Sequence, residues 1–246
     1  MSRESNGTFF EHLEELRRRL AVSLAALLAA FVVPFVYSDR LLDFLSSPLT
    51  GVLPNVYFFS PADAFVVKVK VSLLAACVLA CPVVLGQIWL FISPALYPNE
   101  KKAVLPLVVL TSVLFLCGGA FSFYKVVPMA LQFLIGMQTS FMKPMVSVSE
   151  YLSFLTSMVL AFGIAFNLPV FVLALVGSGA VSAKMLVNFQ RYAIVLIFIA
   201  AAVLTPGPDV ASQILLALPL LALFEFSVVA AVILERLKIR KTEAAG

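Results

Sequence analysis

Charged residues are scarce in this chain. Only 12% of its 246 residues are charged and 62% are hydrophobic, with a mean hydropathy of +1.08. A soluble domain is about half apolar and about a quarter charged, so the composition excludes an ordinary soluble protein. The few charges are clustered, and long uncharged runs lie between them. Such runs are typical of an integral membrane protein.

Residues that carry catalysis or bind metals are equally few. The single histidine is His12, and the three cysteines, Cys77, Cys81 and Cys117, lie inside apolar runs. The sequence contains no zinc-protease motif, phosphate-binding loop or pairing of nucleophile and base. We therefore expect no enzyme, no metal and no cofactor. The net charge of +4 does not indicate nucleic acid, because the basic residues lie at the ends of apolar segments, where membrane topology explains them.

Six apolar segments are each predicted to be a transmembrane helix. A segment in lipid must satisfy its own backbone hydrogen bonds, and the alternating ten-residue runs of barrel strands are missing. We expect an all-α integral membrane protein whose six helices form one bundle, a single domain over residues 1–246. Residues 1–19 are predicted as an interfacial helix and residues 235–246 as a tail. The predicted spans are about 20–36, 71–92, 103–123, 151–176, 192–204 and 210–234.

The fifth apolar segment is short. Residues 192–204 reach only about 20 Å as a helix, against a hydrocarbon core of about 30 Å. The turn Thr205–Asp209 leads directly into the sixth segment. We therefore expect the last two spans to be short. Three prolines lie inside predicted spans and are expected to kink or break these helices. They are Pro82, Pro169 and Pro219.

The distribution of lysine and arginine predicts that both termini are cytoplasmic. With the amino terminus inside, twelve of the 17 basic residues face the cytoplasm and five face outward, as the positive-inside rule requires. The two longest connections, roughly residues 37–70 and 125–150, then lie outside. Both mix apolar residues with turn formers, and we expect them to form a cap over the bundle.

Two carboxylates lie at the predicted inner end of the bundle. Glu15 is on the amino-terminal helix, four residues before Arg19, so an ordinary surface ion pair is one interpretation. Glu100 ends the segment Phe91–Glu100, whose two prolines should make the connection after the second span rigid. At the start of the third helix Glu100 is also favoured by the helix dipole alone.

Two polar side chains lie inside predicted spans. Asn167, two residues before Pro169, either bonds backbone groups or neighbouring helices, or forms a polar spot on a concave face that admits a partner helix. Glu225 is the only acid deep inside a span. It is a functional candidate by default, unless it reaches cytoplasmic water. The sequence leaves both alternatives open.

Six short stretches carry a resemblance to a known family. They are His12-Leu-Glu-Glu15-Leu-Arg17, Ser47-Pro48-Leu49, Pro82–Glu100, Tyr151–Phe154, Phe162–Phe166 and Asp209–Gln213. Together, in this order and spacing, they resemble the TatC family, the receptor subunits of the twin-arginine protein translocase. The resemblance covers nearly the whole chain. It implies a cytoplasmic (inner) membrane protein of a bacterium or archaeon that takes part in the export of folded proteins.

The resemblance also implies a binding site for the paired arginines of a signal peptide. Glu15 and Glu100 match the two recognition glutamates of the family, and Phe91 matches an aromatic residue beside them. Leu96 and Arg17 belong to the same predicted site. The chemistry is suitable, because a carboxylate can accept two hydrogen bonds from a planar guanidinium, which a lysine ammonium cannot reproduce.

A second implied site binds the single-span partners TatB and TatA. Thr205 and Gln213 resemble its polar cluster, with Asn167 as a further member, although many relatives carry a glutamate at the position of Asn167. Pro48 and Asp209 also fall on signature positions; from the residues alone, Pro48 only fixes a turn. The resemblance implies a homo-oligomer within the complex and energy from the transmembrane proton gradient.

A different class of function is a proton-coupled secondary transporter or channel for small solutes. Such transporters commonly show paired halves, interrupted helices and charges near the middle of the membrane. This sequence shows no internal repeat and only one deep acid, Glu225. An intramembrane enzyme is a third alternative, which the lack of a catalytic constellation disfavours.

Overall fold

The computed structural model describes residues 4–50, 57–96, 104–136, 145–204 and 210–245. These residues are almost entirely helical, and their only β contact is an isolated bridge. The elements are α1 (Glu4–Val36), α2 (Ser38–Thr50), α3 (Asp63–Leu96), α4 (Val104–Phe121), the π-helical turn η2 (Ser122–Val126), α5 (Val127–Gly136), α6 (Val148–Ala165), α7 (Leu168–Gly177), α8 (Ala183–Leu204) and α9 (Val210–Ala245).

Six helical stretches are long and apolar enough to cross a membrane. They lie in α1, in α3, in α4 through α5, in α6 with α7, in α8 and in α9. The shortest, Ala183–Leu204, has 22 residues, or about 33 Å at 1.5 Å per residue, which exceeds the thickness of a typical hydrocarbon core. The prediction of an all-α protein with six spans is confirmed.

The predicted ends of several spans are wrong because the apolar runs stop before the helices do. α8 begins nine residues before the predicted span, so the prediction of a short fifth span fails, and α9 has 36 residues. The third span continues through η2, which contains Lys125, into α5. α3 already begins at Asp63 and includes Lys68 and Lys70. Lysine can extend its charged end to the membrane surface, so it ends an apolar run without ending a helix.

The amino-terminal segment is also simpler than the sequence suggested. α1 is one unbroken helix from Glu4 to Val36, with no break near Leu20 where an interfacial helix was expected to turn into the bilayer. The described part of residues 1–19 therefore does not form a separate helix. Good helix-forming residues continue across this boundary, and none of them interrupts the backbone hydrogen bonds.

Only one of the three interior prolines breaks its helix. Pro169 lies in the first turn of α7, and the helix of the fourth span is interrupted just before it, at Phe166 and Asn167. α3 and α9 continue through Pro82 and Pro219. A proline removes one hydrogen bond, and packing by neighbouring helices can hold the remainder of the helix together.

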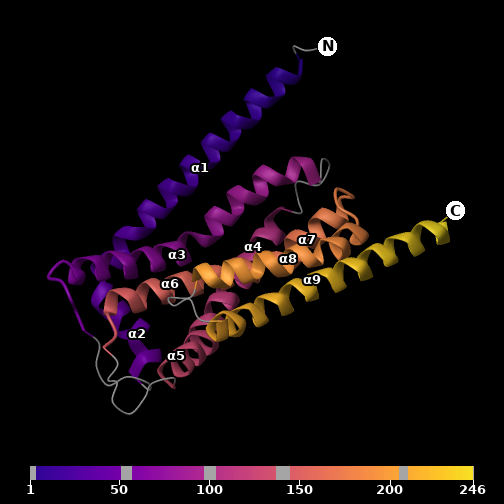
Figure 1. Cartoon of the computed structure of the whole chain (residues 1–246). Helices are drawn as coiled ribbons and strands as arrows, with labels where there is room; N and C mark the ends of the chain where they lie inside the picture. Colours follow the sequence, from indigo (N-terminus) through magenta and orange to yellow (C-terminus); the bar gives the residue numbers. More distant parts are fainter. Residues whose placement is uncertain (1–3, 51–56, 97–103, 137–144, 205–209, 246) are drawn as a thin grey trace.

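Figure 1 shows both chain ends at the same end of the bundle, the amino-terminal end of α1 and the carboxy-terminal end of α9. α2 and the tip of α5 lie at the opposite end. There the two long connections meet, because Tyr57 donates a backbone hydrogen bond to Val146 and accepts one from Val148. The hydroxyl of Tyr151 also donates to the carbonyl of Leu45 in α2, at 2.7 Å. These contacts close this end of the bundle.

The centre of the core is α6. Its residues Leu152, Leu155, Met158 and Phe162 have no exposed surface, and α3, α5 and α9 pack around them. α4 crosses α6 very closely, because a Cβ at Gly118 would lie 2.4 Å from the carbonyl oxygen of Phe162. In contrast, α1 is mostly exposed along its length and packs chiefly against α3 (Figure 1).

Candidate functional site

The candidate site lies where α1 and α3 run side by side in opposite directions, at the end of the bundle that holds the chain ends. The ring of His12 on α1 stacks on Phe91 on α3, with 4.5 Å between the ring centroids and 27° between their planes. This contact fixes the register of the two helices at their outer turns. It also places Glu15, three residues after His12 on α1, close to the last turns of α3.

A short polar chain links Glu15 to α3. One carboxylate oxygen of Glu15, Oε1, accepts hydrogen bonds from Nε of Arg19, at 2.9 Å, and from its Nη2. Nη1 of the same guanidinium reaches Oε1 of Gln87 at 3.5 Å. The ion pair predicted between Glu15 and Arg19 is thus present. The second oxygen of Glu15, Oε2, has no partner among the residues that the structure describes, and the side chain is 37% exposed.

The contacts of His12 with Phe91 and of Arg19 with Gln87 thus hold the turns of α1 on either side of Glu15 against α3, and the binding role of Glu15 and Phe91 stays a prediction. Arg17 lies on the same helix and is exposed to the surroundings. Leu96 is the last residue of α3, and its side chain lies outside the described part of the structure. Glu100 also lies outside the described residues.

Trp89 anchors the end of α3 beneath the site. Its side chain is fully buried, its indole N–H donates to the hydroxyl of Thr111 at 3.1 Å, and its ring stacks on Phe171 with 4.9 Å between centroids. It thereby ties α3 to α4 and α7. The sequence analysis did not single out Trp89 or Gln87; the signal was available for Trp89, because it is the only tryptophan of the chain.

The second predicted cluster is described only in part. Gln213 donates from Nε2 to the carbonyl oxygen of Phe198 at 2.7 Å and so joins α9 to α8. Thr205 and Asp209 lie outside the described residues. Nearby apolar side chains on the two helices are exposed, including Val203 and Leu218.

Asn167 is buried in the break between α6 and α7. Its backbone N–H donates to the carbonyl of Ile164 and not to that of Gly163, which is the regular partner four residues back. The side-chain Nδ2 of Asn167 donates to the Gly163 carbonyl instead, at 2.8 Å. Asn167 thus bonds backbone, as one interpretation of the sequence expected, but the carbonyl is that of Gly163 and not that of Ala165, which Pro169 leaves without its helical donor. The side-chain oxygen Oδ1 has no partner among the described atoms.

Glu225 lies between the last two helices. Its Oε2 accepts a hydrogen bond of 2.7 Å from Nε2 of Gln190 on α8. Nearer the chain end, Glu235 accepts the backbone N–H of Ala183, the first residue of α8, at 2.9 Å. Two carboxylates of α9 thus hold α8, and Gln190 is a partner that the sequence analysis missed.

Pro48, expected to fix a turn, instead lies inside α2, near its carboxy-terminal end.

The fold and the site define a multi-pass helical membrane protein with an accessible carboxylate and an aromatic ring at one end of its first two spans. Comparison with known proteins makes this class specific. The profile of the family described as "Sec-independent protein translocase protein (TatC)" matches residues 11–219. The chain belongs to the TatC family.

Individual relatives agree over most of the chain. The TatC protein of Magnetococcus marinus (strain ATCC BAA-1437 / JCM 17883 / MC-1) is 40% identical, over 92% of this chain and 84% of its own. That of Helicobacter pylori (strain J99 / ATCC 700824) is 42% identical, over 89% and 87%. A crystal structure of the twin-arginine translocase receptor TatC is 36% identical, covers 91% of this chain and 99% of its own, and superimposes with a TM-score of 0.83. The chain is thus a protein-translocase component, and a small-solute transporter is not favoured.

Proposed function

We propose that this chain lies in the cytoplasmic membrane with both termini inside and binds the twin-arginine signal peptides of folded proteins at the α1–α3 site. The distribution of basic residues along the sequence supports the orientation, because twelve of the 17 belong to segments that this orientation places inside. The name of the crystallised relative, a twin-arginine translocase receptor, supports the substrate class.

The observation that carries the proposal is the state of the Glu15 carboxylate. Arg19 occupies one of its oxygens, and the other is free of partners within the described structure. An arginine of the signal peptide can bind this second oxygen without displacing Arg19. Hydrogen bonds to a charged group contribute about 1.5–3 kcal/mol each, so this contact is strong enough to select its ligand.

Glu100 and Phe91 complete the proposed site, together with Leu96 and Arg17. Glu100 is the fourth residue after the end of α3, so chain connectivity keeps its Cα within about 14 Å of that of Leu96. Two carboxylates at this end can each take one arginine of the pair. Phe91, held by His12, offers a ring face to a guanidinium or to the apolar residue that follows the pair.

The test is a charge reversal at each glutamate. Glu15→Lys and Glu100→Lys are each expected to lower export of a folded reporter with a twin-arginine signal peptide at least tenfold, in cells whose only TatC-family protein is the variant. Glu14→Lys is the matched control, because Glu14 is an exposed neighbour in the sequence without an ion pair among the described residues. Membrane levels of each variant should equal the wild type. Near-normal export from both reversed variants would refute the site.

We further propose that the turn between α8 and α9 binds the single-span partners TatB and TatA, with the chain acting as their scaffold within an oligomer. Exposed apolar side chains on the two helices that Gln213 joins support this assignment, as a helix in lipid needs a complementary surface with a polar anchor. Cysteine crosslinking from Val203 and Leu218 should capture a single-span partner, whereas the exposed Leu105 on α4 should not. Equal capture from all three positions would contradict the proposal.

A further inference from the structure

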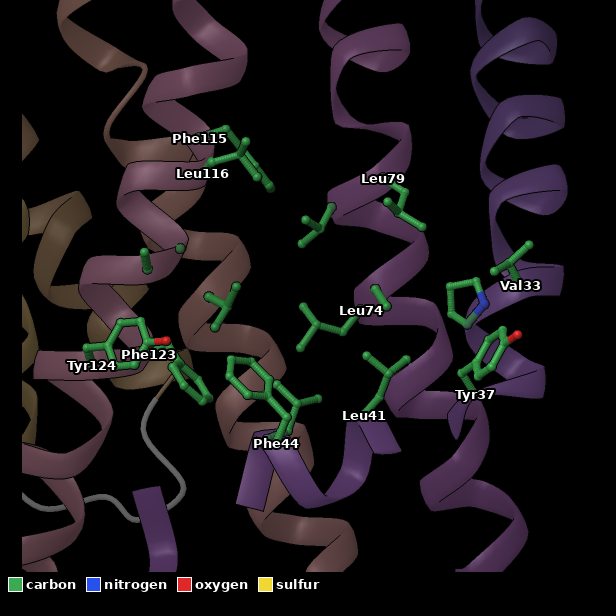
Figure 2. A pocket seen from close by; sticks show the side chains of 17 residues that line it. Val33, Tyr37, Leu41, Phe44, Leu74, Leu79, Phe115, Leu116, Phe123 and Tyr124 are labelled. Atoms are coloured by element: carbon green, nitrogen blue, oxygen red, sulfur yellow. The ribbon is translucent and has the colours of Figure 1, made fainter. Parts of the chain in front are cut away.

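An apolar pocket of about 600 Å³ lies at the end of the bundle opposite the signal-peptide site. α1 and α4 line opposite sides of it, α3 and α6 form its back, and α2 closes one end. Figure 2 shows Phe44 of α2 at this end, Tyr37 on the side of α1 and Tyr124 on the side of η2. Leu79 and Leu116 line its deeper part. Almost no polar atom faces the pocket, so its occupant must be apolar.

The volume selects between two apolar occupants. A helix about 10 Å wide rises 5.4 Å per turn, so two turns need roughly 850 Å³, which is more than the pocket holds. A methylene group occupies about the volume of a liquid water molecule, roughly 30 Å³. A chain of about 16 to 18 carbons therefore needs on the order of 500 Å³ and fits. Pockets of about 300–1,000 Å³ with apolar walls are typical of small-molecule sites.

Two cations adjoin the tyrosines on opposite sides of the pocket. The guanidinium carbon of Arg40 lies 5.9 Å from the ring centroid of Tyr37, and Lys125 directly follows Tyr124 in η2. Neither Arg40 nor Lys125 lies within ion-pair distance of a carboxylate among the described residues. Neighbouring cations differ: Lys68 pairs with Asp39 at 2.8 Å, and Lys70 bonds to Ser149 and Ser153.

The acid that follows Arg40 by one helical turn is Asp43, which is exposed. It forms no ion pair within the described structure and does not line the pocket. The two tyrosines mark the depth at which aromatic side chains meet lipid headgroups. An anionic group at this depth can bind Arg40 on one side of the pocket, or Lys125 on the other, while the chain attached to it enters the pocket.

We propose that the pocket binds one acyl chain of an anionic phospholipid from the adjacent leaflet, with the lipid phosphate held at the mouth by Arg40 or by Lys125. The lipid fills the pocket between α1 and α4. This site lies at the other end of the spans from Glu15, so its occupancy does not depend on the function proposed above.

The experiment is native mass spectrometry of the full chain in detergent, titrated with phosphatidylglycerol or phosphatidylcholine. Ala120→Phe places a ring in the pocket from α4 and is expected to weaken binding of phosphatidylglycerol at least tenfold. Ala222→Phe makes the same change at an exposed position of α9 outside the pocket and should leave binding unchanged. If Ala120→Phe fails to fold, Leu79→Trp fills the pocket from α3 instead.

The headgroup is tested separately. Arg40→Gln with Lys125→Gln should abolish the preference for phosphatidylglycerol over phosphatidylcholine, whereas Lys184→Gln, at the other end of the bundle, should not. Unchanged binding of phosphatidylglycerol by Ala120→Phe would overturn the proposal. A preference for phosphatidylglycerol that survives the double substitution would also overturn it. A photoreactive residue in place of Leu79 should capture lipid in membranes, and capture of a polypeptide there would equally overturn it.

Discussion

α6 and α1 are both long apolar helices, yet the bundle holds them in different ways. The inward residues of α6, such as Leu155 and Phe162, have no exposed surface, and α4 crosses the helix at backbone contact. α1 exposes most of its apolar residues, and its specific side-chain contacts with α3 gather at one end, through His12 and Arg19. In lipid, apolar surface alone does not drive helices together, so close packing and polar contacts decide stability.

The difference separates stability from recognition. The crossing of α4 and α6 is rigid because there is no room for either backbone to move. The α1–α3 site depends on one ring stack and one guanidinium, so it belongs to the less stable part of the molecule, where binding sites are commonly found. Substitutions at the crossing should therefore change folding, and substitutions at the site should change binding.

The largest expected effect is that of Gly118→Ala. The new Cβ would lie 2.4 Å from the backbone oxygen of Phe162, and a backbone cannot rotate away, so α4 and α6 must separate. We expect a loss of about 3 kcal/mol of stability, the upper end for overpacking, seen as a lower midpoint of thermal unfolding in detergent. Gly86→Ala is the control, because its Cβ meets only Val108, at 3.8 Å. Equal stability of the two variants would show that the crossing is looser than described.

Gly163→Ala sharpens the same comparison with a smaller effect. Its Cβ would lie 2.7 Å from a ring carbon of Phe115, and a side chain can turn where a backbone cannot. We expect a loss of about 1–2 kcal/mol. Phe115→Leu should recover part of it, since the shorter side chain leaves room. A double-mutant cycle of the two substitutions measures this coupling, and strictly additive losses would contradict it.

The number and order of the spans could be predicted from sequence because they depend on local apolar runs. Their lengths could not, because the helices around Lys68, Lys125 and Lys184 continue beyond the apolar residues. Whether Pro82 or Pro169 breaks its helix depends on neighbouring helices, which a single sequence does not place. The fold class was therefore predictable, and the helix ends were not.

The candidate site was predictable in its binding residues but not in the contacts that position them. Glu15 and Phe91 stand out as a carboxylate and an aromatic ring at the ends of apolar segments, and the resemblance to TatC joins them. The contacts that position them, His12 on Phe91 and Gln87 on Arg19, cross between two helices. Such contacts depend on the register of α1 against α3, which no local pattern encodes.

The smallest expected effect is that of His12→Ala, which removes the ring stacked on Phe91 at 4.5 Å. An aromatic pair contributes about 0.5–1.5 kcal/mol beyond its buried area. If Phe91 takes part in binding, its loosening should weaken the affinity for a twin-arginine signal peptide about three- to tenfold, with the unfolding midpoint unchanged. His12→Phe keeps a ring and should retain the affinity, and Glu11→Ala, one residue earlier, should have no effect. A lowered unfolding midpoint with unchanged affinity for the signal peptide would show that the His12–Phe91 stack holds α1 in the bundle. In that case the separation between stability and recognition would fail at His12.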